Sequence, residues 1–207
     1  DMRIMDAVLI TLMEHGFTPS AIATRMVYMS APENLQGAVA AGLMAVGSQF
    51  VGTMENNAQI LDQLVQAKDP KAKALEIVSS IRQAREHLPG FGHHLHKPDD
   101  PRTVKLFEIA DNEPELPGHY LKALRLLGNT VDEVYGKHIT INATGATAAL
   151  LGEIGVPSHL MRGFAVISRA AGLVSHIAEE QRVPAGRFIW DTIDHEIPYE
   201  IKNPTRS

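Results

Sequence analysis

The sequence predicts an all-α protein, and three observations support this prediction. Apolar residues recur at helical spacing through most of the chain. Gly, Pro, Asn and Asp stand between these periodic segments, where helices normally begin and end. Neither a convincing strand run nor an internal repeat is visible. We therefore expect helices that pack on helices around shared apolar faces.

The first two helices are predicted over residues 2–14 and from Pro19 onward. Gly16 is a stop signal after the first helix, whereas Thr18 caps the second and Pro19 occupies its first position. One face of the first helix carries, at helical spacing, Ile4, Ala7, Val8, Thr11 and Leu12. His15 lies in the corner between the helices. A structural hydrogen bond and a functional role are both open for it.

A stretch without charge extends from Leu35 to Met54 and is long enough to cross a membrane. Polar side chains interrupt it, no basic flank is present, and its small residues suit close helix packing. A helix that is apolar all round is more often a buried central helix or part of a subunit interface. We expect one of these two roles and no membrane partner.

The remaining helices are predicted over residues 55–66, 70–87, 103–110, 120–135, 143–155 and 161–181. Asp69-Pro70 separates the first pair, because proline disfavours helix in the preceding residue. Gly136 is expected to end the helix of residues 120–135, and Asn142 to begin the helix of residues 143–155. Residues 182–207 contain three prolines and are expected to form a loop.

The composition excludes several function classes. With 44% hydrophobic and 21% charged residues the chain is typical of a globular protein, and a net charge of -5 argues against a nucleic-acid partner. The absence of cysteine excludes a disulfide framework, a thiolate nucleophile and a Cys-type zinc site, and it fits a cytoplasmic protein. The first residues lack the pattern of a signal peptide. Because helical periodicity begins there without a cap, we expect the chain to start inside a longer native one.

Residues 88–102, LPGFGHHLHKPDDPR, are the segment richest in titratable groups, and their Pro and Gly content predicts a shaped loop. A divalent metal could be held here by His93, His94 and His96 with Asp99 or Asp100. Neighbouring residues rarely converge on one ion, however, and no metal-binding spacing is present, so we expect no metal. The alternative is an anion pocket in which Arg102 binds a carboxylate.

Arg169 is the single cation in the apolar middle of the last long helix. An arginine in that position needs a partner. It could complete an anion pocket or pair with an acidic residue such as Glu153, and both remain open. Nucleophile elbows, phosphate-binding loops and dinucleotide fingerprints are absent from the sequence.

Three segments resemble motifs of the citrate synthase superfamily, in the family's order. LPGFGHHLHKPDDPR resembles its PG(F/Y)GH...DPR signature. EHGFTPSAIATR resembles its segment with a histidine, a serine and an arginine, and ISRAAGLVSHIAEEQ resembles its late R-x-x-G-x-x-(A/S)-H-x-x-E helix. The resemblance implies an all-α homodimer. Its large domain would comprise residues 1–54 and 156–207, with further helices missing before Asp1, and its small domain residues 55–155.

The same resemblance implies a binding site for oxaloacetate or for the citrate part of a product. His93 would polarise a carbonyl as the catalytic group, while His15, Arg102 and Arg169 would bind carboxylates. A CoA thioester would be a substrate, and no tightly bound cofactor is implied. The family's acyl-CoA site falls on Leu88, Gly90, Phe91, Gly92 and Lys137.

Two positions depart from the family's pattern. In SQFVGTMEN, Val51 stands where the family has a histidine that helps to enolise the acetyl group. In INATGATAA, Thr144 stands where the family has its catalytic aspartate. Neither side chain exchanges protons at neutral pH, so condensation by the family's usual route is not expected.

A subgroup labelled citryl-CoA lyase is similar to this sequence through GFGHHLHKPDDPR and LQGAVAAGL. We therefore expect a carbon-carbon lyase that cleaves citryl-CoA, or a related polycarboxyl-CoA, to acetyl-CoA and oxaloacetate. His94, His96 or Glu55 could replace the missing acid and base. One alternative is a catalytically silent homologue that binds di- or tricarboxylates or CoA esters. A third is a citrate synthase that condenses acetyl-CoA with oxaloacetate.

Overall fold

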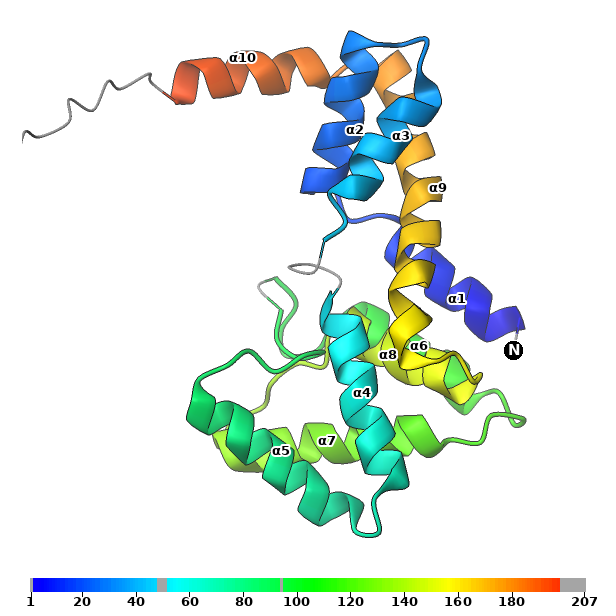
Figure 1. Ribbon diagram of the computed structural model, residues 1–207, viewed down its shortest axis with the longest axis vertical. Helices are drawn as coiled ribbons and strands as arrows, with labels where there is room; N and C mark the ends of the chain where they lie inside the picture. The colour runs from blue at the N-terminus through cyan, green and yellow to red at the C-terminus, as the bar shows by residue number, and fades with distance from the viewer. Residues whose placement is uncertain (1, 48–51, 94, 198–207) are drawn as a thin grey trace, which may run out of the picture. The chain divides into compact units, whose positions relative to one another are not determined.

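The computed structural model describes residues 2–47, 52–93 and 95–197, and over these the chain is helical (Figure 1). The predicted all-α fold is confirmed. The chain forms two compact units. The first contains Asp1–His15 and Val46–Ala170, and the second contains Gly16–Ala45 and Ala171–Ser207. These boundaries differ from those of the predicted large and small domains, and that domain assignment stays a prediction.

The first unit is built around one buried helix. Its elements are α1 (Met2–Met13), α4 (Gly52–Gln66), α5 (Pro70–Ala84), α6 (Pro101–Asp111), α7 (His119–Tyr135), α8 (Ala143–Glu153), the 3-10 turn η1 (Ser158–Leu160) and the beginning of α9 (Met161–Arg182). α8 packs against α1, α4, α6 and α7, and every residue of it except Thr144 is buried. Its many Ala and Gly residues allow these four neighbours to approach closely.

The predicted start and inward face of several helices are confirmed in this unit. The side chains of Asp69 and Asn142 cap α5 and α8 by accepting a hydrogen bond from the backbone N–H of the third residue of each helix. The predicted inward face of α7 is buried: Leu121, Leu124, Leu127 and Val131. Glu153 accepts hydrogen bonds from the N–H groups of Gly118 and Leu121, at 2.9 and 2.8 Å. It thus holds the first turn of α7, and its suggested pairing with Arg169 is wrong.

The second unit contains α2 (Pro19–Ser30), α3 (Leu35–Met44), the remainder of α9 and α10 (Gly186–Glu196). α2 begins at Pro19 after Thr18, as predicted, but the side chain of Thr18 makes no capping hydrogen bond to the backbone. α2 and α3 meet at Gly42, where an added Cβ would lie 1.9 Å from the hydroxyl oxygen of Thr24 and 2.7 Å from the carbonyl oxygen of Ser20. Only glycine allows this approach of the two backbones.

The apolar stretch that begins at Leu35 is not a buried central helix. α3 ends at Met44, and of its residues only Ala38 and Gly42 are buried, while Met44 is 87% exposed. The buried central helix is α8. Across the described part of the chain, none of the helices combines the length and the apolar character that a membrane crossing requires. A role in a subunit interface stays a prediction for α3.

The prediction of a loop for residues 182–207 is wrong over α10. Pro184 and Pro198 flank this helix instead of interrupting it, and Ile189, Ile193 and Ile197 recur at the four-residue spacing of one helix face. Glu180 accepts hydrogen bonds from the N–H groups of Ala185 and Gly186, which fixes the start of α10. Residues 198–207 lie outside the described residues.

Candidate functional site

The loop between α5 and α6 is held against the segment that precedes α8. The N–H of Gly92 donates to the carbonyl oxygen of Thr140 at 2.7 Å, and the N–H of Asn142 donates to that of Gly90 at 3.0 Å. Between them Phe91 pairs with Ile141 and is 1% exposed. This short antiparallel contact sets His93, the next residue of the loop, beside the first turn of α8.

Gly90 is required by both conformation and space. Its φ is +81°, in the left-handed region that favours glycine. An added Cβ would lie 2.5 Å from the amide nitrogen of Asn57 and 3.0 Å from the Cα of Gly145. The amide of Asn57 also donates to the carbonyl oxygen of Pro89 at 2.9 Å. The close packing of the PGFG segment therefore fixes the backbone that leads to His93.

The ring of His93 is oriented by its own loop. Its Nδ1 accepts hydrogen bonds from the N–H groups of Leu95 and His96, both at 3.1 Å, and the ring of His96 stacks on it with centroids 4.4 Å apart. An imidazole whose Nδ1 accepts carries its proton on Nε2 when it is neutral. His93 therefore presents Nε2–H as a hydrogen-bond donor.

Arg102 lies next to that donor, because its Nη2 is 3.3 Å from Nε2 of His93. Its guanidinium is held by Asp100, a fully buried residue that accepts from both Nε and Nη2 of Arg102. Burial raises the pKa of Asp100, but hydrogen bonds from the side chain and backbone of Arg102, together with its charge, bring the net pKa below its ordinary value. Two neighbouring donors of this kind suit an oxygen acceptor such as a carboxylate, a carbonyl or a hydroxyl.

His15 and Arg169 belong to the same compact unit. The ring of His15 lies edge-on to that of His93, with centroids 6.1 Å apart. Burial lowers the pKa of Arg169, and the nearby charge of Glu14 opposes this shift. The Nη1 atom of Arg169 is buried without a hydrogen-bond partner among the described residues. The structure therefore places His15 and Arg102 beside His93. Arg169 is related to them only through the charge of Glu14, the neighbour of His15, and its Nη1 has bonding capacity left for an anion.

Thr144 lies in the first turn of α8 and joins a hydrogen-bond chain. Its hydroxyl donates to Oδ1 of Asn142 at 2.6 Å, and its oxygen is 3.3 Å from the hydroxyl of Thr53 in the first turn of α4. The Thr53 contact was not predicted, because the two threonines are 91 positions apart. Val51 and His94 lie outside the described residues.

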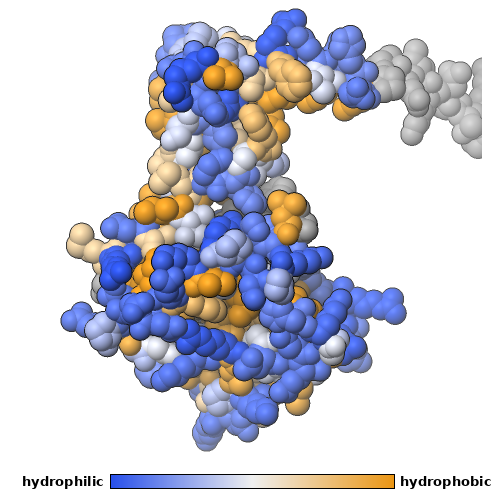
Figure 2. Space-filling view, turned by 180° about the vertical axis from the view of Figure 1, so that it is seen from behind, coloured by the Kyte–Doolittle hydropathy of each residue, from blue (hydrophilic) through white to orange (hydrophobic). Residues whose placement is uncertain are grey.

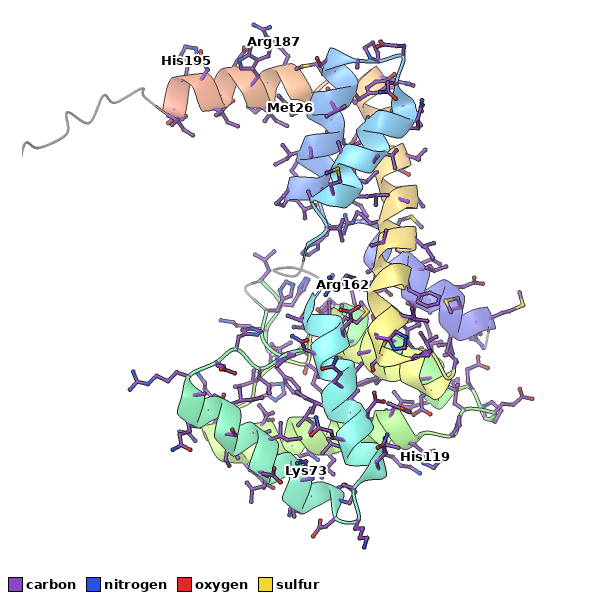
Figure 3. The ribbon with its side chains drawn as sticks, viewed as in Figure 1. Met26, Lys73, His119, Arg162, Arg187 and His195 are labelled. Carbon is purple, nitrogen blue, oxygen red and sulfur yellow. The ribbon has the colours of Figure 1, made fainter. Side chains whose placement is uncertain are left out.

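The other groups suggested as a base are already engaged. Glu55 accepts a hydrogen bond from Arg162 at 2.6 Å, and Figure 3 shows Arg162 beside α4. His96 supports His93 by stacking. The role of Arg162 was also not predicted. One signal was available, because Arg162 and Arg169 are seven residues apart and share one face of α9, two turns from each other.

The residues predicted to contact a CoA thioester hold the loop in place. Leu88 and Phe91 are buried, and backbone groups of Leu88, Gly90 and Gly92 already bond within the chain. Lys137 is exposed beside His138, which bridges Asp132 and Asp99. A CoA-binding role for these five residues stays a prediction.

His93, His96 and Asp100 also place ligand atoms within 4.8 Å of one another, a spacing that a metal ion could use. Both oxygens of Asp100 are hydrogen-bonded to Arg102, however, and the guanidinium would repel a cation. Nδ1 of His93 already accepts two N–H groups. The arrangement therefore suits an anion better than a metal.

The family model for the C-terminal domain of citrate synthase matches residues 1–189 of the chain. The chain belongs to the citrate synthase family. Citryl-CoA lyase from Hydrogenobacter thermophilus is 32% identical and has a TM-score of 0.85 over 99% of this chain and 78% of that one. Its similarity to this chain confirms the resemblance to the citryl-CoA lyase-like members of the citrate synthase family.

More distant relatives share the fold over a smaller part of their length. ATP citrate lyase from Methanothrix soehngenii, solved in complex with citrate and coenzyme A, is 18% identical with a TM-score of 0.76 over 97% of this chain and 34% of that one. ATP-citrate synthase subunit 1 of Sordaria macrospora is 24% identical over 95% of this chain and 31% of its own length. The chain thus spans about a third of the curated relatives that it matches first.

Several residues of the citrate synthase motifs serve the fold. Arg25 is fully buried, and its guanidinium donates to Nδ1 of His176 at 3.1 Å, to Glu180 at 2.7 Å and to Glu179. The guanidinium also lies over the ring of Phe17, 4.9 Å from its centroid. This buried network joins α2 to the second half of α9 and, through Glu180, to the start of α10. In this chain the arginine, histidine and glutamates of these segments therefore have a structural role.

Proposed function

We propose that this chain is the substrate-binding part of an enzyme that cleaves citryl-CoA, or a closely related polycarboxyl-CoA thioester, to acetyl-CoA and oxaloacetate. The observation that carries the proposal is the donor pair formed by Nε2 of His93 and Nη2 of Arg102, 3.3 Å apart. In citryl-CoA the carbon that bears the hydroxyl also bears a carboxylate. Two adjacent donors match these two oxygen groups.

Each of the four residues then has a role in the proposal. His93 donates to the hydroxyl oxygen of the citryl group, which becomes the keto oxygen of oxaloacetate. Arg102, fixed by Asp100, binds the neighbouring carboxylate. Arg169, whose Nη1 has no partner in the described part of the chain, and His15 bind a further carboxylate.

The replacement of the family's aspartate by Thr144 removes the group that in the family transfers the proton at the acetyl methyl carbon. Condensation begins with removal of a proton from the acetyl methyl group, which needs a base, and a threonine hydroxyl cannot act as that base at neutral pH. Cleavage begins with citryl-CoA already formed; the hydroxyl proton of the citryl group must be lost to an acceptor such as water, and the departing enolate must be stabilised and protonated. The similarity of this chain to the citryl-CoA lyase of Hydrogenobacter thermophilus supports the proposal of a lyase.

The proposal includes assembly into a homodimer. In the second unit large apolar side chains remain exposed, among them Met44 on α3, Val174 on α9 and Phe188 and Trp190 on α10. Figure 2 shows apolar side chains among polar ones along α10. Surfaces of this kind are typical of subunit interfaces. The proposal places the enzyme in the cytoplasm, in keeping with a sequence without cysteine, and light scattering would measure the expected dimer mass.

The test is an assay of the purified protein with citryl-CoA, which measures release of acetyl-CoA and oxaloacetate. Isothermal titration with citrate and with oxaloacetate accompanies it. Binding without turnover would favour the catalytically silent homologue, and release of free CoA from acetyl-CoA and oxaloacetate would favour citrate synthase activity. Absence of both binding and cleavage in a folded protein would overturn the proposal.

Arg169→Ala tests the assignment of the anion site. Removing a charged group that pairs with a buried ligand charge weakens binding by about 10²–10³-fold, and we expect that loss for citrate. Arg125→Ala is the control, because Arg125 is an exposed arginine of the same unit that pairs with Asp111. Equal citrate affinity in Arg169→Ala and the unchanged protein would remove Arg169 from the site.

A further inference from the structure

The hydrogen-bond chain through Asn142, Thr144 and Thr53 has a defined direction. The amide nitrogen of Asn142 donates to the carbonyl oxygen of Gly92 at 3.1 Å, so its oxygen faces α8, where it accepts from the N–H of Gly145 at 3.1 Å. The same oxygen accepts the hydroxyl proton of Thr144 at 2.6 Å. Thr144 can therefore offer only lone pairs to Thr53, and Thr53 is the donor across their 3.3 Å contact.

Of these three hydrogen-bonded residues, Thr53 is therefore the one whose hydroxyl proton can turn to another acceptor. Its contact with Thr144 is long for an O–H to O hydrogen bond, whereas that of Thr144 with Asn142 is short. A negatively charged oxygen is a stronger acceptor than a neutral hydroxyl, so the Thr53 hydroxyl will prefer such an oxygen when one comes within reach. Thr53 is half-buried, and its helix α4 packs directly on α8.

The position of Thr53 relative to the anion site follows from the same contacts. Asn142 binds Gly92, which precedes His93, and the N–H of Ala143 donates to the Asp100 carboxylate that holds Arg102, at 3.3 Å. Thr144 and Thr53 are thus connected to the His93 and Arg102 donor pair through Asn142 and Asp100. The first turns of α4, α6 and α8 meet here, and their N-terminal dipoles favour negative charge.

We propose that Thr53 is a catalytic residue of the lyase, which donates a hydrogen bond to the thioester carbonyl oxygen as this oxygen gains charge during cleavage, and that Thr144 and Asn142 are positioning residues that aim it. This inference rests on the proposed function and adds to it the group that stabilises the enolate. In place of a proton-abstracting carboxylate, the chain has a neutral hydroxyl pair.

The step is balanced as follows. The bond between the carbinol carbon and the α-carbon of the thioester breaks, and its electron pair forms the carbon-carbon double bond of the enolate of acetyl-CoA. The hydroxyl proton of the citryl group passes to water, and the carbinol carbon becomes the keto carbon of oxaloacetate. A proton from water then adds to the α-carbon and gives the methyl group of acetyl-CoA. Thr53 keeps its own proton and stabilises the enolate oxygen throughout.

The experiment compares Thr53→Val with Thr53→Ser in steady-state cleavage of citryl-CoA. Valine has the shape of threonine without the hydroxyl, and removal of one such donor lowers kcat by about 10²–10³-fold. We expect that loss in kcat for Thr53→Val, with KM changed by less than about threefold because the charge develops only in the transition state. Thr53→Ser keeps the hydroxyl and is expected to stay within about tenfold of the unchanged enzyme. A Thr53→Val enzyme that folds and cleaves at the unchanged rate would overturn the inference.

A binding measurement separates this inference from the lyase proposal. Carboxymethyl-CoA carries a negatively charged oxygen where the enolate would form, and its affinity is measured by calorimetry. We expect Thr53→Val to bind it about tenfold more weakly and Thr53→Ser to bind it as the unchanged protein does, even if citryl-CoA is not the substrate. Equal affinity in all three proteins would show that Thr53 does not contact the thioester oxygen. Thermal melting confirms that each variant is folded.

Discussion

Asp100 accepts three hydrogen bonds from Arg102, from the backbone N–H at 3.0 Å, from Nε at 3.0 Å and from Nη2 at 2.8 Å. The same carboxylate caps α6 and accepts from the N–H of Ala143 at the start of α8. One buried side chain therefore joins two helices and sets the direction of the arginine that is proposed to bind substrate. Because the carboxylate serves both the fold and the site, changing it should affect both.

Asp100→Asn should lower both stability and substrate affinity. An asparagine amide would place N–H donors against the guanidinium and the N–H of Ala143, and leaving such buried groups unpaired costs about 1–3 kcal/mol. Urea unfolding at pH 7 measures the free energy of unfolding, with Asp6→Asn on the exposed side of α1 as control. The pKa of Asp100 is lowered in the folded protein, so its contribution is present above its unfolded pKa of about 3.8 and is lost as the pH falls below it. Equal stability of Asp100→Asn and the unchanged protein at pH 7 would contradict this assignment.

Gly90→Ala should be more destabilising than Gly136→Ala. Both glycines have positive φ, at +81° and +68°, so each substitution places a Cβ in a region that costs about 1–2 kcal/mol. An added Cβ meets nothing within 4 Å at Gly136, but at Gly90 it meets Asn57 and Gly145. Chemical unfolding of the two variants measures the difference. If their unfolding free energies agree, the contact between the loop and α8 is looser than these distances indicate.

Sequence periodicity predicted the helices well where one face is buried within the chain. α7 and α8 follow the predicted pattern and caps closely, because their apolar residues and cap side chains act over a few positions. α10 forms where the proline content predicts a loop, because prolines beside a segment limit the length of a helix without preventing it. The apolar run from Leu35 predicts a buried central helix or a subunit interface, but only Ala38 and Gly42 of α3 are buried in the second unit.

The candidate site was predicted residue by residue through motifs, whereas its internal contacts were not. His15, His93, Arg102 and Arg169 fall in segments whose residue types and spacing resemble a family. The contact of Thr53 with Thr144, and that of Glu55 with Arg162, join residues 91 and 107 positions apart. These two contacts form because α4 packs on α8 and on η1, the turn before α9. No local pattern in the sequence specifies that packing.

His138→Gln should reduce stability more at pH 6 than at pH 9. The hydrogen bond to Asp132 raises the pKa of His138, burial lowers it slightly, and Asp99 adds to the rise. A raised pKa means that the contribution is fully present below the unfolded pKa of about 6.5 and is lost as the pH rises through the higher folded value. For an exposed pair the effect is about 0.2–1 kcal/mol. Urea unfolding at the two pH values measures it.

His119→Gln is the matched control for this experiment. His119, at the start of α7 (Figure 3), is also exposed, and no ion pair of it is seen within the described part of the chain. Its replacement should leave the pH dependence unchanged. A pH dependence that is the same in His138→Gln and in the unchanged protein would mean that the bridge between Asp132 and Asp99 does not contribute to stability.

Thr144→Asp should accelerate the exchange of the methyl hydrogens of acetyl-CoA with solvent deuterium relative to the unchanged protein. A carboxylate at this position lies in the first turn of α8, where the helix dipole favours its charged form, and it can act as the base that a threonine cannot be. Mass spectrometry of acetyl-CoA incubated with oxaloacetate and protein in deuterium oxide measures the exchange. Thr144→Asn, which has nearly the same shape without a base, should not accelerate the exchange. Rapid exchange in the unchanged protein and in Thr144→Asn would instead show that another side chain already removes the methyl proton.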